Sequence, residues 1–568
     1  MKIKILLLFA FIFTLNVNSQ TALPIPSTLS GNNINLTMNT GTVSFLPGNP
    51  TQTFGFNGSP YLGPTLILEK GQNANIMVTN QIGESTSVHW HGMHVAAMND
   101  GGPHTPILNG TTWNPQFTVL DKAATYWYHP HFHGKTAEHA IKGAAGLIIV
   151  KDPEEAALNL PRTYGQDDFP IIVQTAQFNN NNQLMPLGMQ DSLAIVNGVR
   201  ANYGQSVFLN VPSQIIRLRL LNAAGERSFN FGFTANKSFK IIASDGGLLN
   251  APINATRIRV SPGERYEILV DLNGMNGQSI QLMSYASELP IGLQGGPTMP
   301  MPPGSPPMDS PINGIDFNLL QLNIGAQTSN PVLSTPTTLA VFTPISASTS
   351  NITRTINMTA LNPMSMDGPF YMNGLLFDMD RIDYIIPLDN TEIWQITNQT
   401  MVAHPFHIHD VQFYLLDRDG NMPPLFERGR KDEVLIYPNE TVSFITNFDT
   451  FEDDMMPYMY HCHILMHEDA GMMGQFLVKS NLNTDNQNLV LTKTINISPN
   501  PVNDSFSINI PESTSDYDVK ITDATGKVVG TSKSKNNMLI DVSCLSSGVY
   551  QVIVKNNTNF YSGKMIKN

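Results

Sequence analysis

The sequence predicts an all-β protein that is divided into several domains. Its 568 residues are too many for a single hydrophobic core, so three or four domains are expected. Glycine (42) and proline (39) separate many short runs in which Val, Ile and Thr alternate with polar residues. Such runs are typical of strands joined by tight turns. The composition, 41% hydrophobic and 14% charged, is that of a globular protein.

Residues 1–19 predict a signal peptide. Lys2 and Lys4 precede an apolar run from Ile5 to Leu15, and small polar residues follow near Ser19. A run of this length is too short for a stable membrane span, although a lone hydrophobic anchor is the alternative. We expect a monomer without a stable membrane span, exported through the periplasm and then secreted or held at the cell surface.

The charge balance argues against a nucleic-acid partner, because 45 acidic residues outnumber 32 basic ones and no basic cluster occurs. Export favours disulfides, yet Cys462 and Cys544 are the two cysteines of the chain. A bridge between them is arithmetically allowed, but Cys462 lies between two histidines, where a metal-ligand role is favoured. Cys544 is expected to be buried as a small apolar residue.

The fourteen histidines fall in two windows, from His89 to His139 and from His404 to His467. The windows also resemble each other. "HWH" at residue 89 matches "HIH" at 407, "YHPH" at 128 matches "YHCH" at 460, and "GLIIVKD" at 146 matches "GQFLVKS" at 474. We therefore expect two copies of one β-rich unit, with the two histidine windows converging in space.

This repeat and shifts in composition predict domains at residues 20–155, 156–325 and 326–482, and a small C-terminal β module at 490–568. The middle domain has strand-like runs such as "QIIRLRLLN" and "RYEILVDL" but no histidine. It also contains a Pro/Gly/Met-rich loop at residues 295–311. In this loop Met299, Met301 and Met308 are either soft ligands for Cu(I) or ordinary filler.

Four His-x-His pairs predict a multinuclear metal site. Side chains on a strand alternate between its faces, so each pair presents two imidazoles on one side. The pairs are His89/His91, His129/His131, His407/His409 and His461/His463. Imidazole suits copper, zinc, iron or nickel, so the pairs alone do not identify the metal.

Cys462 identifies the metal as copper. In "HCH" its side chain points away from His461 and His463, toward a second site with His404, His467 and Met472. Two histidines, a thiolate and a weak axial methionine form a blue-copper electron-transfer site. The backbone then links this site directly to two ligands of the histidine cluster. In the first copy Thr86, Pro130 and Lys135 take the places of His404, Cys462 and His467, so that copy lacks a blue site.

The motifs "HWHG", "YHPHFHG", "HPFHIH" and "HCHILMHEDAGMM" resemble those of the multicopper oxidases over residues 25 to 480. The resemblance implies three Greek-key β-barrels of the cupredoxin type and four copper ions per chain. It implies the following ligands: His404, Cys462, His467 and Met472 for type 1 copper; His89 and His407 for type 2; His91, His129 and His463 for one type 3 copper, and His131, His409 and His461 for the other.

The same resemblance implies an oxidase that takes four single electrons from a donor and reduces dioxygen to two waters. Asp100 and Glu468 match acidic positions that deliver protons to the cluster, with solvated loop acids as the alternative. A phenol or aromatic amine is the expected donor, and Cu(I) or Fe(II) is the alternative. The cuprous oxidases carry an acid and a methionine where this chain has Thr400 and Val402, which argues against that branch.

Two other functions share some of these features. A protein that only stores copper needs no cysteine between two cluster ligands, and a copper nitrite reductase needs no eight paired imidazoles. The C-terminal module resembles the sorting domain of the type IX secretion system of Bacteroidetes, through "PNP", "DATGKVV", "LSSGVY" and the ending "KMIKN". A generic adhesive module is the alternative. The resemblance implies that this secretion machinery is a partner and that the module is removed after export.

Overall fold

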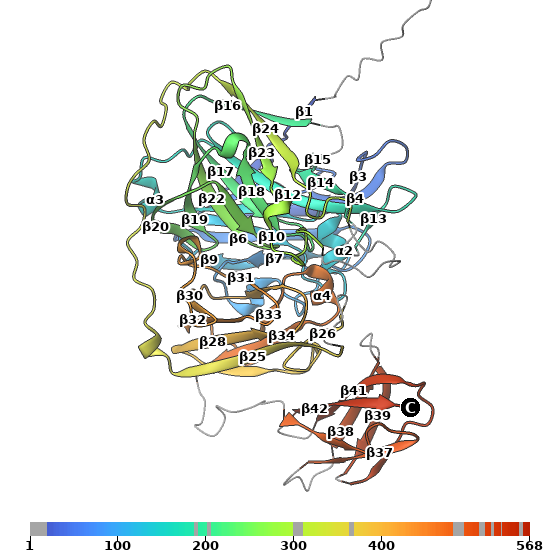
Figure 1. Ribbon diagram of the computed structural model, residues 1–568. Helices are drawn as coiled ribbons and strands as arrows, with labels where there is room; N and C mark the ends of the chain where they lie inside the picture. The colour runs from blue at the N-terminus through green and yellow to red at the C-terminus, as the bar shows by residue number, and fades with distance from the viewer. Residues whose placement is uncertain are drawn as a thin grey trace, which may run out of the picture.

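The computed structural model describes residues 20–186, 191–201, 206–298, 310–362, 368–480, 493–510, 517–523, 528–535, 537–555 and 560–568. The predicted signal peptide and Met299, Met301 and Met308 lie outside the described residues. Figure 1 shows three large β units and a smaller one near the C-terminus. The predicted all-β fold is confirmed. Among the described residues, no helix is long and apolar enough to cross a membrane.

The first β unit packs two sheets against each other, with strand orders β4-β3-β6-β8 and β2-β5-β11-β10-β7, and with β9 beside β6. Alternate residues of β3 and β6, such as Leu36 and Val78, point inward and are fully buried. The strands are β2 (Thr28–Ser30), β3 (Asn33–Val43), β4 (Thr51–Phe56), β5 (Thr65–Glu69), β6 (Asn73–Gln81), β7 (His89–His91), β8 (Thr112–Trp113), β9 (Gln116–Thr118), β10 (Ala124–His129) and β11 (Gly146–Lys151).

The second unit also has two sheets, β1-β16-β24-β23-β18-β21 and β15-β14-β12-β17-β22-β19-β20, and β13 pairs with β12. The first described strand, β1, therefore belongs to this unit. The strands are β1 (Gln20–Ala22), β12 (Asp168–Phe178), β13 (Leu184–Met185), β14 (Leu193–Val196), β15 (Val199–Arg200), β16 (Ser206–Pro212), β17 (Ile215–Asn222), β18 (Phe229–Phe233), β19 (Phe239–Ser244), β20 (Gly247–Ala255), β21 (Arg257–Val260), β22 (Arg265–Asp271), β23 (Ser279–Ser284) and β24 (Phe317–Gly325).

The third unit consists of the sheets β26-β25-β28-β32-β30 and β27-β34-β33-β29-β31. Trp394 is fully buried between them, among aromatic rings from β29, β32, β33 and β34. The strands are β25 (Ile352–Ala360), β26 (Phe370–Met372), β27 (Tyr384–Pro387), β28 (Asn390–Asn398), β29 (His404–Ile408), β30 (Tyr414–Arg418), β31 (Glu433–Ile436), β32 (Thr441–Phe448), β33 (Tyr458–Cys462) and β34 (Met473–Lys479).

The C-terminal module has its own core, formed by residues such as Phe506 and Val552, between the sheets β35-β42-β41-β38-β39 and β36-β37-β40. The prediction that Cys544 is buried is wrong. It lies exposed in the turn after β40, where Val542 and Leu545 turn inward instead. The strands are β35 (Lys493–Thr494), β36 (Asn496–Ser498), β37 (Ser505–Asn509), β38 (Tyr517–Thr522), β39 (Val528–Ser534), β40 (Leu539–Asp541), β41 (Gly548–Lys555) and β42 (Phe560–Lys567).

Helices are short, and two of them join the first unit to the third. The Asp469 carboxylate, at the end of α4, accepts hydrogen bonds from the backbone N–H groups of Thr136 and Ala137 at the start of α2, both at 2.9 Å. The helices are α1 (Ala97–Asp100), α2 (Thr136–Ile141), α3 (Pro153–Ala156) and α4 (Leu465–Asp469), with the 3-10 turns η1 (Thr234–Asn236), η2 (Ala286–Glu288), η3 (Ala347–Thr349) and η4 (Leu425–Glu427).

The structure shows the internal repeat directly. The strand order β5-β11-β10-β7 in the first unit corresponds to β27-β34-β33-β29 in the third, with the same parallel and antiparallel neighbours. In both copies a glycine on one strand leaves room for a tyrosine side chain on the neighbouring strand. A Cβ atom on Gly146 would lie 2.3 Å from the Tyr128 hydroxyl, and one on Gly474 would lie 2.2 Å from the Tyr460 hydroxyl. Each glycine is therefore required by the tyrosine of the histidine-bearing strand beside it.

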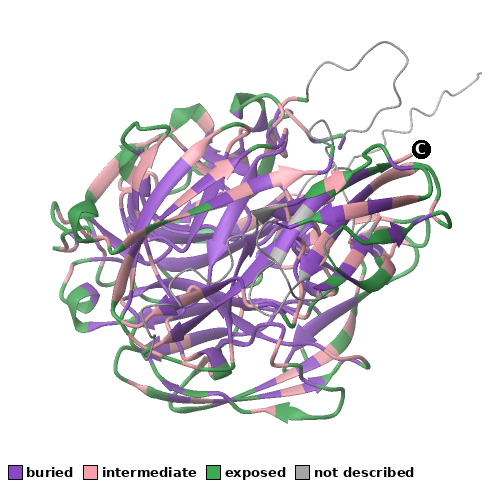
Figure 2. Ribbon diagram, turned by 90° about the horizontal axis from the view of Figure 1, so that it is seen from below, coloured by how far each residue is buried: buried purple, intermediate pink, exposed green. Residues whose placement is uncertain are grey.

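A buried ionic network holds the second unit to the third. The Lys431 ammonium donates to Asp245 Oδ2 at 2.7 Å and to Glu264 Oε1 at 2.9 Å. Next to it, the Arg265 guanidinium donates to both oxygens of Asp432 at 2.6 Å. Each of these five residues is at most 1% exposed. In Figure 2 buried positions fill the interior of the barrels and exposed positions follow the periphery.

We expect Lys431→Met to destabilise the folded chain, because it leaves the carboxylates of Asp245 and Glu264 buried without this cation. Removing one partner of a buried ion pair costs about 3–5 kcal/mol. The thermal unfolding midpoint should fall by several degrees. Lys122→Met is the matched control, because Lys122 pairs with Glu154 at the exposed surface and such changes stay within roughly 0.5 kcal/mol. Equal shifts in the two variants would contradict this prediction.

Candidate metal centre

The eight histidines of the four His-x-His pairs lie together between the first and third units. They come from β7, β10, β29 and β33 or from the residues directly after these strands. Every one is at most 1% exposed. The convergence of the two histidine windows, predicted from the sequence, is confirmed by contacts such as the stacking of His91 on His407, with ring centroids 3.7 Å apart.

Six of these histidines form two triads in which one ring nitrogen from each lies within 4.8 Å of the others, namely His91/His129/His463 and His131/His409/His461. In the first triad His91 Nδ1 lies 3.3 Å from His129 Nε2. In the second, His461 Nε2 lies 3.1 Å from His131 Nε2 and 3.2 Å from His409 Nε2. Two nitrogens that each bind one metal at about 2.0 Å are spaced by roughly this distance.

The remaining pair, His89 and His407, has the features expected of ligands. The Nε2 atoms of both rings are buried and have no hydrogen-bond partner in the described part of the chain. Both also form a third group with His409. A buried ring nitrogen without a partner is costly unless it binds something, and imidazole nitrogen is a good copper ligand. The residues therefore fit the copper that the motifs imply.

Most of the eight rings are oriented by a hydrogen bond on the side away from the cluster. Such outer partners fix which nitrogen remains free to bind a metal. His91 uses Nε2, which donates to Asp432 Oδ1 at 3.2 Å. Others donate through Nδ1 to backbone carbonyls: His89 to Asp100 (2.9 Å), His407 to Asp432 (2.7 Å), His129 to Pro130 (2.8 Å) and His461 to Cys462 (3.0 Å).

Burial also keeps seven of these imidazoles neutral. Loss of hydration, reinforced in most of them by neighbouring histidines, lowers the pKa well below its usual range in His91, His129, His131, His407, His409 and His463. The pKa of His461 falls to about 3 for the same main reason. Neutral imidazole is the form that binds a metal, so these seven side chains need no deprotonation before a metal binds.

The second predicted site lies on the other face of β33. Cys462 Sγ is 3.4 Å from His404 Nδ1 and 3.7 Å from His467 Nδ1, and the two Nδ1 atoms are 3.3 Å apart. Met472 is fully buried in the same core cluster as Cys462. Burial raises the pKa of the Cys462 thiol well above its usual range, so a thiolate here requires a cation beside it. Bound copper would supply that cation.

Asp100 and Glu468 each lie behind two histidines. Asp100 Oδ2 accepts a hydrogen bond from His409 Nδ1 at 2.7 Å, and its Oδ1 lies 3.3 Å from His89 Nδ1. Glu468 has its two carboxylate oxygens 3.3 Å from His131 Nδ1 and from His461 Nδ1. Both are buried, and burial raises the pKa of Glu468 well above its usual range. Neither is a solvated loop acid.

The four other histidines have different surroundings. His94 pairs with Asp410, His104 Nε2 donates a hydrogen bond to Gln475 Oε1, and His139 shares a hydrogen bond with the Thr86 hydroxyl. His133 is exposed and touches Phe377. In the described part of the chain none of them belongs to a group that could hold a metal. Thr86 is the counterpart of His404, so its bond to His139 occupies the place of a second blue site.

Sequence reasoning missed the acidic pair Asp432 and Glu433 at the start of β31. Both are fully buried beside the cluster, and burial together with Glu264 and Asp432 raises the pKa of Glu433 well above its usual range. A signal was present, because "RKDEVLIYP" places consecutive charges directly before an apolar strand. Charged residues so close to a buried strand are uncommon without a partner.

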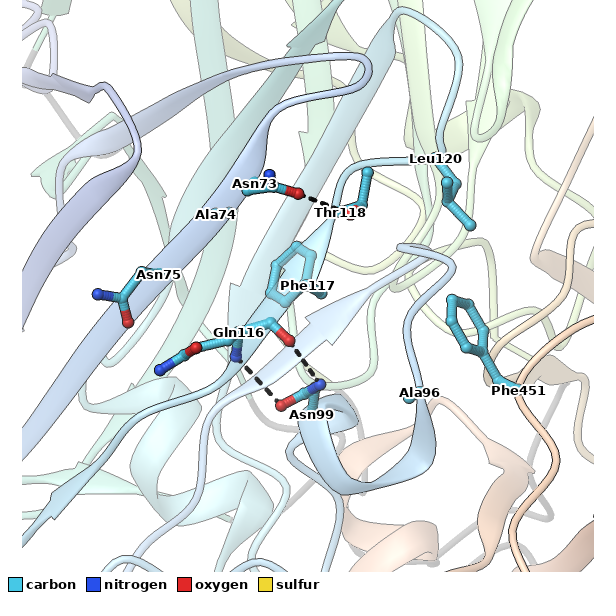
Figure 3. A pocket seen from close by; sticks show the side chains of 10 residues that line it. All are labelled: Asn73, Ala74, Asn75, Ala96, Asn99, Gln116, Phe117, Thr118, Leu120 and Phe451. Atoms are coloured by element: carbon cyan, nitrogen blue, oxygen red, sulfur yellow. Dashed lines mark hydrogen bonds between the residues drawn. The ribbon is translucent and has the colours of Figure 1, made fainter.

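A surface pocket of about 610 Å³ lies beside α1, between Phe117 of the first unit and Phe451 of the third (Figure 3). No residue of its lining is titratable, and its amides bond one another. Asn99 Nδ2 donates to the Gln116 carbonyl at 2.9 Å, and the Gln116 backbone N–H donates to Asn99 Oδ1. This pocket has the groups neither for metal binding nor for acid–base chemistry.

Comparisons with known proteins agree with this geometry. Family models described as multicopper oxidase match residues 37–155, 163–285 and 343–481, and a model described as a secretion system C-terminal sorting domain matches residues 496–568. A multicopper oxidase of Staphylococcus haemolyticus is 32% identical over 455 residues, 78% of this chain and 88% of that protein. The cell division protein FtsP of Escherichia coli is 30% identical over 469 residues, 81% of this chain and 93% of that protein.

Solved structures show the same fold. A laccase-like multicopper oxidase, CueO, from Ochrobactrum sp. superposes with a TM-score of 0.69 at 32% identity, covering 80% of this chain and 100% of that one. A metallo-oxidase from Campylobacter jejuni gives a TM-score of 0.65 at 25% identity, covering 80% and 96%. The three large units are therefore cupredoxin-like Greek-key barrels, as predicted, and the chain belongs to the multicopper oxidase family, with a C-terminal sorting domain attached.

Proposed function

We propose that this protein is an oxidase that couples four one-electron oxidations of a donor to the reduction of dioxygen to two waters. The observation that carries the proposal is the position of Cys462 between His461 and His463. Its side chain faces the His404/His467 site, and the flanking histidines belong to the two triads. A protein that merely stored copper would gain nothing from this covalent link between two sites.

Two groups of side chains would bind the copper ions at two separate sites. His404, Cys462, His467 and Met472 would hold one copper, and the eight paired histidines would hold three. Bound copper would supply one-electron redox chemistry at the first site and dioxygen reduction at the second. The short backbone path from Cys462 to each flanking histidine gives electrons a covalent route between the sites.

Protons for water formation would come through Asp100 and Glu468. Each carboxyl group reaches two cluster histidines on the side away from the metal-facing nitrogens. They approach the cluster from different elements, Asp100 from the end of α1 and Glu468 from α4. A reaction that consumes four protons in a buried cavity needs such relays, and the raised pKa of the Glu468 carboxyl group lets it both hold and release a proton.

The exposure of the type 1 ligands favours a small organic donor. His467 is 8% exposed, whereas His404 is fully buried and its Nε2 shares a hydrogen bond of 2.8 Å with the Thr400 hydroxyl. Electrons would therefore enter at the edge of His467, beside the ring of Phe370, whose centroid is 4.4 Å from the imidazole. A phenol or aromatic amine suits such an edge. Cu(I) or Fe(II) is the second candidate, supported by the likeness to a metallo-oxidase.

The C-terminal sorting domain suggests that the oxidase is secreted or held at the cell surface. We propose that the type IX secretion machinery reads this domain and that the chain passes through the periplasm. Copper and dioxygen would both be met outside the cytoplasm.

Cys462→Ser should abolish both the blue absorption and oxygen consumption while the copper bound by the eight histidines stays in place. Serine lacks the soft thiolate that type 1 copper requires. Metal analysis, the visible spectrum and an oxygen electrode measure the three quantities. Cys544→Ser is the matched control and should leave all three unchanged. A wild-type protein that bound copper yet showed neither blue absorption nor oxygen uptake would overturn the proposed function.

Asp100→Asn and Glu468→Gln should slow reoxidation by dioxygen, by roughly 10²- to 10⁴-fold if each group transfers protons. The amides keep the size of the acids but cannot cycle a proton. Stopped-flow reduction of the blue site by the donor should keep its wild-type rate, because the type 1 ligands are untouched. Glu452→Gln, at an exposed position, is the control. Wild-type reoxidation rates in both variants would remove the two acids from the mechanism.

Oxygen uptake measured with a methoxyphenol, bilirubin, Cu(I) and Fe(II) on one copper-loaded preparation should be fastest with an organic donor. The physical reason is that His467 is slightly accessible whereas His404 is fully buried, and that the hydrogen-bond partner of His404 Nε2 is the Thr400 hydroxyl in place of a metal-binding carboxylate. A clear preference for Cu(I) would instead establish the metallo-oxidase alternative and would leave the oxidase itself intact.

A further inference from the structure

Three consecutive charged residues, Lys431, Asp432 and Glu433, enter the interior at the start of β31, and all are fully buried. Lys431 is neutralised by Asp245 and Glu264, and Asp432 by Arg265. Glu433 is different. Neither of its carboxylate oxygens has a hydrogen-bond partner in the described part of the chain. An unpartnered buried carboxylate is one of the costliest groups a fold can contain, so it requires an explanation.

The Glu433 carboxylate lies just outside the ring of cluster histidines. Its Oε2 is 3.9 Å from His91 Nε2 and 4.0 Å from His407 Nδ1. Both of those nitrogens point away from the cluster, because His91 faces His129 through Nδ1 and His407 Nδ1 donates to the Asp432 carbonyl. Glu433 is therefore placed behind the ligands and is not itself one of them.

His463 is the group that can donate a hydrogen bond to Glu433. It belongs to one of the two triads, yet neither ring nitrogen has a hydrogen-bond partner among the described residues. Its Nδ1 edge faces the space beside Gly263. A Cβ on Gly263 would lie 3.1 Å from His463 Nδ1 and 2.7 Å from Glu433 Oε2. The imidazole and the carboxylate thus border the same small space, separated by no more than one bridging water can span.

Gly263 keeps this space open. Its φ of +90° favours glycine, and any side chain would collide with the Glu433 carboxylate. Six of the other cluster histidines donate to backbone carbonyls or to the carboxylates of Asp100 and Asp432, and His131 has Glu468 3.3 Å from its Nδ1. The vacant Nδ1 of His463 and the vacant oxygens of Glu433 complement each other in hydrogen-bonding type, because a protonated Nδ1 donates and a carboxyl oxygen accepts.

We propose that Glu433 is a positioning residue for the copper cluster: it accepts the Nδ1–H of His463 through one bridging water, and thereby presents His463 Nε2 to copper. The inference rests on the proposed function, since it concerns a ligand of the cluster. The carboxylate also compensates part of the positive charge that the bound metal brings into a buried site. Without metal the group is destabilising, and with metal it strengthens ligand binding.

Glu433→Leu and Glu433→Gln distinguish this role from an ordinary structural one. Leucine removes the acceptor, whereas glutamine keeps an acceptor oxygen and loses the charge. Outer partners of metal ligands typically change metal affinity or activity 10- to 100-fold, so Glu433→Leu should lose copper from the cluster to about this extent and Glu433→Gln should retain more. Copper titration of the apoprotein and the near-ultraviolet absorption of the coupled copper pair report the loss.

Thermal unfolding supplies a readout that is independent of activity. Because Glu433 has no hydrogen-bond partner among the described residues, both variants should unfold at the wild-type temperature or above it without copper. When copper is added, their unfolding midpoint should rise less than that of the wild type. A merely structural residue would lower the midpoint in both states. Glu440→Gln is the control, since Glu440 pairs with Arg418 in the same domain away from the cluster and should leave the copper-dependent gain unchanged.

The outcomes separate this inference from the proposed function. Failure of the wild-type protein to bind copper in a blue site and a coupled pair would remove the proposed function, and this inference with it. Normal loading of the wild type, together with full copper affinity and an unchanged coupled-pair absorption in Glu433→Leu, would overturn the role of Glu433 alone. Loss of stability in both metal-free variants would overturn it as well.

Discussion

The metal centre depends on the interface between the first and third domains, because each domain contributes half of the eight histidines. Neither domain can form the cluster alone. Arg265 of the second domain contacts both of these domains at their interface. Its Nε donates to the Thr125 carbonyl of the first domain at 3.0 Å, and its guanidinium holds both oxygens of Asp432 in the third. A buried ion pair of this kind tolerates little displacement, since each charge would lose its compensation.

The two histidine-bearing domains are copies of one β unit, and only the third domain has the ligands of the candidate blue-copper site. Both retain the strand order, the His-x-His pairs and the glycine that admits a tyrosine ring. They differ at the position between the histidines, Pro130 in one copy and Cys462 in the other. Around Pro130 the matching space is taken up by the bond between Thr86 and His139. Under the proposed function, this asymmetry would give the molecule one electron-accepting site beside one symmetric cluster, which is what a one-way electron path requires.

Much of the fold and of the candidate site was predictable, because both depend on local periodicity. Alternation along a strand places His461 and His463 on one face and Cys462 on the other, and the structure has this arrangement. Burial of single residues was less predictable. Cys544 was expected inside the C-terminal module, but the turn after β40 directs Val542 inward and leaves the cysteine exposed. Composition alone does not reveal which residue of a turn faces the core.

The sequence by itself determined the all-β class, the histidine pairs, the cysteine between two of them and the resemblance to multicopper oxidases, since these depend on residue types at short spacings. Only the tertiary structure decided how the surrounding groups reach the ligands. The resemblance had indicated Asp100 and Glu468, but the contacts from Asp100 to His409 and from Glu468 to His131 cross the boundary between two domains. Glu433 lies in the same domain as His463, yet only the folded chain brings both beside Gly263 of the second domain. Contacts between separate strands leave no periodic trace in a single sequence, so these surroundings became visible in detail only when the chain was folded.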